Sequence, residues 1–257
     1  MNGSHELPLA GRCVAVTRER PGALGVLLAE RGATVLHVPL IEVVDPDDGG
    51  RMFGLAMADV ADIDWVAVTS VPGAERTAAA LGARASDIKV ACVGIATAAR
   101  WEELTGHTVD LVPERQLASS LASAFVKAHS GSSAQRVIVA QADRAGADLV
   151  DRLRGAGHDV QAITAYRTVG RLPTIDEIDQ LRTADAVLFA SGSAVAGWFD
   201  ALGDDAHLCL PPTIVAIGPS TAAAAEDYGL TVRTIASDHS MPGLVTALEG
   251  VWRQTPK

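Results

Sequence analysis

Small hydroxyl residues and glycines recur where short apolar runs end, and they are the first candidates for chemistry. Two serines each follow such a run, and two further runs end in a glycine with a threonine three residues later. The six residues are Ser70, Ser191, Gly94, Thr97, Gly218 and Thr221. Residues of this kind begin helices, where unpaired backbone N–H groups favour a carboxylate or phosphate ligand. Ordinary helix capping is the alternative, so the binding interpretation depends on their occurrence in matched pairs.

Two further places in the sequence could take part in catalysis or binding. Tyr166 is one of two tyrosines in the chain, and its phenol could donate a hydrogen bond to a departing group. A packing role in the core is the alternative for this residue. Thr17 and Arg18 follow the first apolar run. The guanidinium of Arg18 could meet an acidic ligand there, and the alternative is that it belongs to a solvated turn.

Motifs of several other chemistries are absent from the sequence. Segment 94–97 lacks the GxGxxG fingerprint, and no phosphate-binding GxxxxGK[ST] loop or GxSxG nucleophile elbow is present. Cys13, Cys92 and Cys209 are scattered, and no HExxH or comparable ligand spacing occurs. We therefore expect no cofactor, no metal, and three reduced cysteines, with Cys13 and Cys92 on buried strands.

Composition and charge narrow the class of protein. The chain has 257 residues, of which 48% are hydrophobic and 20% charged, as in a globular chain of one to two domains. Its formal net charge of −10 and lack of basic runs argue against a nucleic-acid partner. No apolar run approaches a membrane span, and we expect no secretory signal in segment 1–6. We expect a cytoplasmic monomer that binds a small molecule and neither nucleic acid nor membrane.

Short β-branched runs alternate with Ala- and Leu-rich segments of helical period along the whole chain, which predicts parallel sheets with helices between the strands. Strands are expected at 13–17, 34–38, 65–69, 89–93, 108–112, 136–140, 159–165, 186–190, 213–217 and 231–235. Helices are expected at 23–31, 74–81, 97–104, 119–129, 147–156, 175–182, 194–202, 220–228 and 242–249. Ten strands are many for one sheet of this length, so we expect two sheets of about five.

Two parts of the chain resemble each other. Segment 64–74 matches 185–195, each being a strand that ends in serine before a helix, and segment 93–99 matches 217–223. The offset is 121 residues between the serines and 124 between the glycines. This repeat indicates two similar α/β halves, and a chance match between common strand–helix turns is the alternative.

The repeat leaves the first strand–helix–strand, residues 11–38, without a counterpart. We therefore expect a discontinuous first α/β domain of residues 1–38 and 168–257, with residues 42–164 inserted as the second. Extended segments on both sides supply hinge linkers at 39–41 and 165–167, and a cleft would lie between the domains.

Over nearly its whole length the sequence resembles the uroporphyrinogen-III synthase family. The resemblance rests on the order and spacing of short elements: Val14–Arg18, Gly32-Ala33 followed by Val38–Ile41, Thr69-Ser70, Val93-Gly94 with Thr97-Ala98, Tyr166–Thr168, Phe189–Ser193 and Ile217–Ala222. It implies two flavodoxin-like parallel-sheet domains, a two-strand hinge, and an active site in the interdomain cleft. Val71-Pro72 departs from the family, since many members have a polar or basic residue there.

The resemblance also implies an activity, that of a cofactor-free lyase in tetrapyrrole and heme biosynthesis. Such an enzyme cyclises hydroxymethylbilane to uroporphyrinogen III. The terminal hydroxyl leaves as water, the substituted carbon of the last ring attacks the resulting azafulvene, and a spiro intermediate fragments and recloses with that ring inverted. By analogy, Tyr166 assists departure of the hydroxyl. The implied substrate-binding residues are Thr17, Arg18, Ser70, Gly94, Thr97, Ser191, Gly192, Ser193, Gly218, Pro219 and Thr221.

Two alternative functions stay open at the level of sequence. A cytosolic two-domain sensor or binding protein, built like a periplasmic binding protein, would share the hinge and the cleft. A nucleotide-dependent transferase or reductase would need phosphate motifs that the sequence lacks. Formation of the III isomer from hydroxymethylbilane, rather than the uncatalysed I isomer, distinguishes the synthase from the sensor or binding protein.

Overall fold

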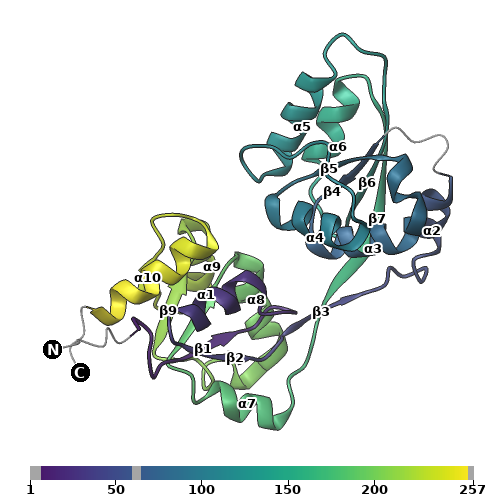
Figure 1. Ribbon diagram of the computed structural model, residues 1–257. Coiled ribbons are helices and arrows are strands. Elements are labelled where there is room, and N and C mark those ends of the chain that lie inside the picture. Colours follow the sequence, from purple (N-terminus) through teal and green to yellow (C-terminus); the bar gives the residue numbers. More distant parts are fainter. Residues whose placement is uncertain (1–6, 60–64, 254–257) are drawn as a thin grey trace. The chain divides into compact units, whose positions relative to one another are not determined.

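The computed structural model describes residues 7–59 and 65–253, and Figure 1 shows its elements. Asp64 of the repeat and segment 1–6 lie outside the described residues. The chain divides into two compact units, which we call unit 1 (Met1–Glu42 with Val169–Lys257) and unit 2 (Val43–Thr168). The inserted domain expected at 42–164 differs from unit 2 by one residue at its start and four at its end.

Within the described residues, unit 1 contains a five-stranded sheet in the order β10-β9-β8-β1-β2. Its strands are β1 (Cys13–Val16), β2 (Thr34–His37), β8 (Ala186–Phe189), β9 (Thr213–Ala216) and β10 (Thr234–Ile235). Each of these neighbours pairs in parallel. Numbered by their sequence within the unit, the strands follow the order 2-1-3-4-5, which is the flavodoxin-like arrangement.

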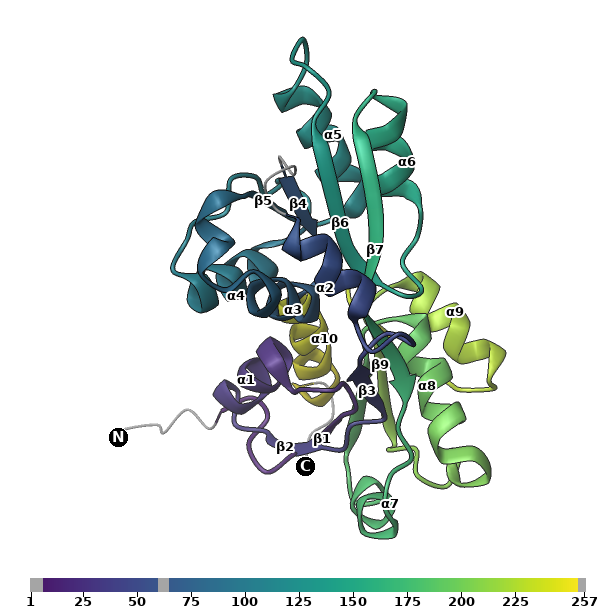
Figure 2. The same ribbon diagram turned by 90° about the vertical axis from the view of Figure 1, so that its right-hand side faces the viewer.

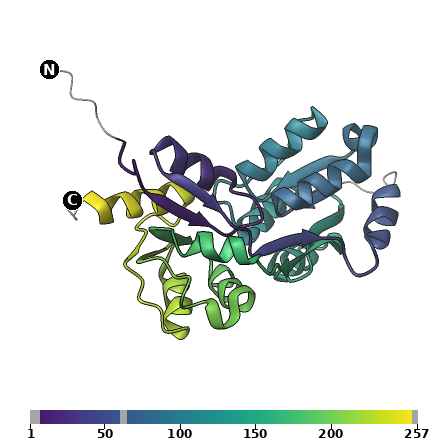
Figure 3. The same cartoon turned by 90° about the horizontal axis from the view of Figure 1, so that it is seen from below.

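Helices cover both faces of this sheet. Helices α1 (Gly22–Glu30) and α10 (Met241–Arg253) pack on one face and lie side by side in Figure 3. The opposite face is covered by α7 (Ile175–Leu181), α8 (Gly192–Leu202) and α9 (Pro219–Asp227), around the fully buried Trp198. The turn between α8 and β9 includes the short 3₁₀ helix η3 (Gly203–Asp205).

Unit 2 is built on a second sheet, which among the described residues has the order β3-β7-β6-β4-β5. Its strands are β3 (Ile41–Val44), β4 (Trp65–Val68), β5 (Lys89–Cys92), β6 (Arg136–Ala142) and β7 (Asp159–Gly170). The long strands β6 and β7 run side by side in Figure 2 and pair in parallel. The pairs β4–β5 and β4–β6 are parallel as well, so the prediction of two parallel sheets is confirmed.

Helices again cover both faces of the sheet. One face packs against α2 (Arg51–Ala58), α3 (Val71–Leu81), the 3₁₀ helix η2 (Gly82–Asp87) and α4 (Ile95–Thr105), with Trp101 fully buried. The other face packs against α5 (Ala118–Ala128) and α6 (Asp148–Gly155), around Phe125. Among the described residues, no helix is long and apolar enough to cross a membrane.

The two units are circular permutations of one another. In unit 1 the central strand β8 is flanked by β9 and by the β1–α1–β2 segment, and in unit 2 the central strand β4 is flanked by β5 and by β6–α6–β7. Residues 11–38, which had no counterpart in the sequence repeat, thus correspond to β6–α6–β7. The expected strand at 108–112 is reduced to one bridge between Leu111 and Ala91, at the place that β10 takes in unit 1.

Two further features differ from the sequence-based expectation. Helix α2 was not predicted; it follows Gly49 and Gly50, which both have left-handed backbone. The carboxylate of Asp48 caps it by accepting from the N–H groups of Gly50 (3.0 Å) and Met52 (2.7 Å), and the bond from Met52 is the main reason that the pKa of Asp48 is lowered. Cys13, expected to be buried, is half-buried on β1.

Candidate active site

The catalytic and binding candidates of unit 2 lie where β4, β5 and β7 approach the carboxyl edge of the sheet. Ser70 follows β4 and caps α3, and Gly94 follows β5 and begins α4. The chain leaves β4 toward β5 on one side and β6 toward β7 on the other, so the topological switch point lies between β4 and β6. Open α/β sheets bind their ligands at such a point.

A hydrogen bond joins the predicted catalytic tyrosine to a predicted binding serine across this switch point. The phenol of Tyr166 donates to Oγ of Ser70 over 2.8 Å, although the two residues are 96 positions apart in the chain. Ser70 Oγ also accepts from the N–H of Gly73 at 3.1 Å, which is its capping bond. Tyr166 is only 7% exposed, so its side chain is held between β7 and α3.

An irregularity in β7 aims the tyrosine ring. Gln141 pairs with Thr164, but the next residue, Ala142, pairs with Tyr166, so β7 has one extra residue at this point. In a regular strand neighbouring side chains point to opposite faces. Here Ala165 and Tyr166 both join the core cluster that contains α3, because a β-bulge shifts the alternation. The sequence contained no signal for this bulge.

Gly73 permits the close approach of α3 to Ser70, and sequence reasoning missed it. A Cβ atom at this position would lie 3.1 Å from Ser70 Oγ and 3.3 Å from a methyl carbon of Val68. A side chain there would therefore push against the serine that Tyr166 contacts.

The beginning of α4 is covered by a side chain that the sequence analysis did not select. Oε1 of Gln116 accepts a hydrogen bond of 3.2 Å from the N–H of Ile95, and a Cβ on Gly94 would lie 2.5 Å from the same oxygen. An amide oxygen thus occupies the place where a ligand carboxylate would bind. Thr97, the third residue of the helix, is 4% exposed, which leaves little of its side chain to a ligand.

Unit 1 repeats this design at the end of β8. Ser191 caps α8, its Oγ accepting from the N–H of Ala194 at 3.1 Å, and it lies 2.9 Å from Oγ of Ser193. Gly192 serves packing, because a Cβ there would lie 3.1 Å from Cβ of Ala224 on α9.

The end of β9 is the counterpart of the end of β5. Gly218 precedes α9, Pro219 is the first residue of that helix, and Thr221 is 2% exposed. A Cβ on Gly218 would lie 3.4 to 3.5 Å from the ring of His239. His239 follows Gln116 by 123 residues, so each unit places a polar side chain from the next loop over the glycine that begins the helix.

The end of β1 completes the carboxyl edge of unit 1 beside β8. Thr17 is buried and its carbonyl accepts from the N–H of Leu40 at 2.9 Å. The side chain of Arg18 is exposed, and its carbonyl contacts Nε2 of His37 at 2.8 Å. The side chain of Arg18 is therefore open to solvent, while little of the Thr17 side chain is exposed.

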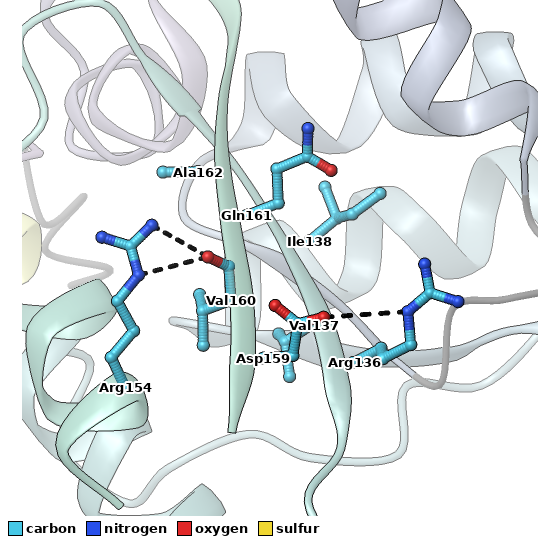
Figure 4. Close-up of a pocket in the computed structure, with 8 residues that line it drawn as sticks. All are labelled: Arg136, Val137, Ile138, Arg154, Asp159, Val160, Gln161 and Ala162. Atoms are coloured by element: carbon cyan, nitrogen blue, oxygen red, sulfur yellow. Dashed lines mark hydrogen bonds and ion pairs between the residues drawn. The ribbon is translucent and has the colours of Figure 1, made fainter. Parts of the chain in front are cut away.

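A separate pocket lies away from these residues. It is lined by the first residues of β6, the first residues of β7 and Arg154, which Figure 4 shows with both Nε and Nη2 on the carbonyl of Val160. This is the amino-terminal part of both strands, and charged side chains there cover the exposed strand edge. None of the candidate residues lines this pocket.

The cysteines are poor candidates for nucleophiles. Burial raises the pKa of all three thiols, and that of Cys92 to about 12. A thiol must ionise to react as a nucleophile, so these side chains act as small apolar groups.

Comparison with known proteins agrees with this geometry. A family model described as uroporphyrinogen-III synthase HemD matches residues 23–246. A uroporphyrinogen-III synthase of Synechococcus elongatus is 27% identical over 267 residues, covering 97% of this chain and 99% of the relative. Among solved structures, the Helicobacter pylori enzyme matches with a TM-score of 0.63 at 15% identity (93% and 99% covered). A mutant Thermus thermophilus enzyme matches with 0.55 at 17% identity (96% and 100% covered). The chain belongs to the uroporphyrinogen-III synthase family.

Proposed function

We propose that this chain converts hydroxymethylbilane to uroporphyrinogen III through the residues at the carboxyl edges of its two sheets. Membership of an enzyme family favours this over the sensor or binding protein. The observation that most supports the site is the hydrogen bond from Tyr166 to Ser70 at the switch point of unit 2. It places a phenol and a serine hydroxyl together at the edge where a ligand binds.

The substrate's carboxylates would be held at the starts of α3, α4, α8 and α9. The first N–H groups of each helix have no partner within the helix, and the helix dipole adds partial positive charge. One such position is the N–H of Ile95, which donates to the amide oxygen of Gln116. A carboxylate oxygen of the substrate could accept the same hydrogen bond. The exposed guanidinium of Arg18 would add a charged contact.

We propose further that one substrate molecule contacts both units in a cleft, with residues 39–41 and 165–167 as the hinge. Matched helix starts in two units suit a long, flexible molecule that has carboxylates along its length. The chain passes between the units at Glu42–Val43 and at Thr168–Val169. These residues lie in β3 and β7, which are neighbours in one sheet.

The reaction needs the terminal rings to be brought together more than it needs a strong acid or base. Departure of the hydroxyl leaves a cation stabilised by the pyrrole, so hydrogen bonding from the Tyr166–Ser70 pair would suffice to assist it. The amides at the helix starts would fix the carboxylates, and thereby the fold of the chain, during attack by the substituted carbon.

The decisive experiment supplies hydroxymethylbilane to the purified protein and separates the products by isomer. The proposal predicts mainly uroporphyrinogen III, formed without added metal or cofactor. We propose further that the protein is a monomer and is cytoplasmic. Formation of the I isomer alone, at the rate of the buffer control, would overturn it. Tight binding without turnover would favour the sensor or binding protein instead.

A further inference from the structure

Oγ of Ser70 has both of its acceptor positions filled. It accepts the phenol proton of Tyr166 at 2.8 Å and the N–H of Gly73 at 3.1 Å. A hydroxyl has two acceptor lone pairs and one proton to donate. Within the part of the chain that the structure describes, that proton has no acceptor. The remaining function of this partly exposed hydroxyl is therefore to donate.

Tyr166 is in the opposite situation. Its side chain is more than nine-tenths buried in the core cluster beneath α3, and its one proton is directed at Ser70. The bulge at Ala165 holds the ring in this place. The phenol thus reaches the carboxyl edge of the sheet through the serine hydroxyl.

Unit 1 lacks this arrangement, although it is a circular permutation of unit 2. Ser191 occupies the position of Ser70, accepts the equivalent helix N–H at 3.1 Å, and has another serine hydroxyl beside it in place of a phenol. His37 pairs with Val16, the last residue of β1, just as Tyr166 pairs with Ala142, the last residue of β6. Its ring contacts the carbonyl of Arg18 instead of Ser191. Of the two matched serines, Ser70 therefore accepts a hydrogen bond from a phenol, and Ser191 does not.

Resting on the proposed function, we infer that Ser70 is the group that touches the departing hydroxyl and that Tyr166 acts through it as a positioning residue and proton source. The C–O bond breaks, its electron pair stays on the oxygen, and this oxygen takes the proton of Ser70 and leaves as water. Ser70 takes the proton of Tyr166, because a phenol is a stronger acid than an alcohol. When the inverted terminal ring regains aromaticity, its α-carbon releases one proton, which returns through Ser70 to the phenolate. The balance is one water lost per turnover.

A double-mutant cycle tests this order of contacts. Tyr166→Phe removes the proton source, and we expect kcat to fall about 10²-fold, at the low end for a lost general acid. Ser70→Ala should lower kcat at least as far. The double variant should be no slower than Ser70→Ala, because without the serine the phenol has no route to the substrate. Ser70→Thr keeps both the helix cap and the hydroxyl, and it should restore most of the rate.

Unit 1 supplies a readout that a merely structural role would not change. Ser191→Ala removes the equivalent cap in unit 1, so it should raise KM and combine multiplicatively with Tyr166→Phe. Multiplicative effects of Ser70→Ala and Tyr166→Phe would overturn the relay, as would full activity of Ser70→Ala. A wild type that forms no III isomer would instead overturn the proposed function.

Discussion

The amide oxygen of Gln116 accepts a hydrogen bond from the backbone N–H of Ile95, 3.2 Å away, and lies directly over Gly94. This oxygen reaches α4 from the loop that follows Leu111, and the loop after β10 brings His239 to Gly218 in the same way. Two of the four helix starts that we assign to substrate carboxylates, those of α4 and α9, therefore have a loop side chain above a glycine. The side chain has to move when the carboxylate arrives.

Replacing Gln116 by Glu tests whether a carboxylate binds at this helix start. The new carboxylate would accept from the same N–H of Ile95, where the helix dipole favours it, and would exclude the carboxylate of the substrate. We expect KM to rise about tenfold with little change in kcat, a loss typical of one charge-assisted contact. Steady-state kinetics with hydroxymethylbilane measures this.

Gln161→Glu is the matched control for that variant. It adds the same charge to unit 2 at an exposed position on β7, away from the carboxyl edge. Its KM should stay close to that of the wild type. Equal KM values for the two variants would remove the start of α4 from the binding site.

The sequence predicted the alternation of strands and helices because each core element has a clear period. Nine of the helices lie within a few residues of their expected bounds, and the matched positions of Ser70 and Ser191 are both helix caps in the structure. Short apolar strands ending in small residues before a helix are local patterns, so a single sequence contains them.

What the sequence could not predict depends on contacts between distant segments. The bulge at Ala165 exists only in the register between β6 and β7, and the partner of Tyr166 is 96 residues away. Gln116 and His239 belong to irregular loops, whose course no periodic pattern describes. The correspondence of 11–38 with β6–α6–β7 was hidden because the permutation places the two segments at different points of the repeat.

Salt dependence follows from the charge of the protein. With a net charge of −10, the chain opposes the approach of a substrate that has many carboxylates. Salt screens this repulsion, while contacts with backbone N–H groups act at short range. We expect KM to fall or to stay constant between about 0.05 and about 0.5 M salt. A steep rise of KM with salt would indicate a basic docking surface and contradict recognition by helix amides.

We expect unit 2 to fold by itself when it is expressed with the bounds that the structure gives. A fragment of residues 43–168 retains all of the core cluster around α3 and should unfold in one cooperative thermal transition. The fragment 42–164, which the sequence suggested, ends before the buried residues Ala165 and Tyr166. Loss of a large buried side chain costs about 3 kcal/mol or more, so this fragment should be clearly less stable. Two disordered fragments would contradict the inserted-domain assignment.

The last prediction concerns the stability of unit 2 between neutral and mildly acidic pH. His158 is 9% exposed, and its Nδ1 accepts from the N–H of Gln135 at 3.2 Å. Burial, and secondly the neighbouring His129, lower the pKa of His158. In the folded state His158 therefore binds a proton less readily than in the unfolded chain, where a histidine has a pKa of about 6.5. The contribution of neutral His158 to the free energy of unfolding is complete above that pH and is lost as the pH falls below it.

Replacement of His158 by Asn keeps an acceptor for Gln135 and removes the titration. Thermal unfolding measured at about pH 7.5 and about pH 5.5 avoids most carboxylate titration. Between these values the melting temperature of the wild type should fall by more than that of His158→Asn. His107→Asn changes an exposed histidine of the same unit, and its melting temperature should fall as far as that of the wild type. An equal fall in the wild type and His158→Asn would show that protonation of His158 does not destabilise unit 2.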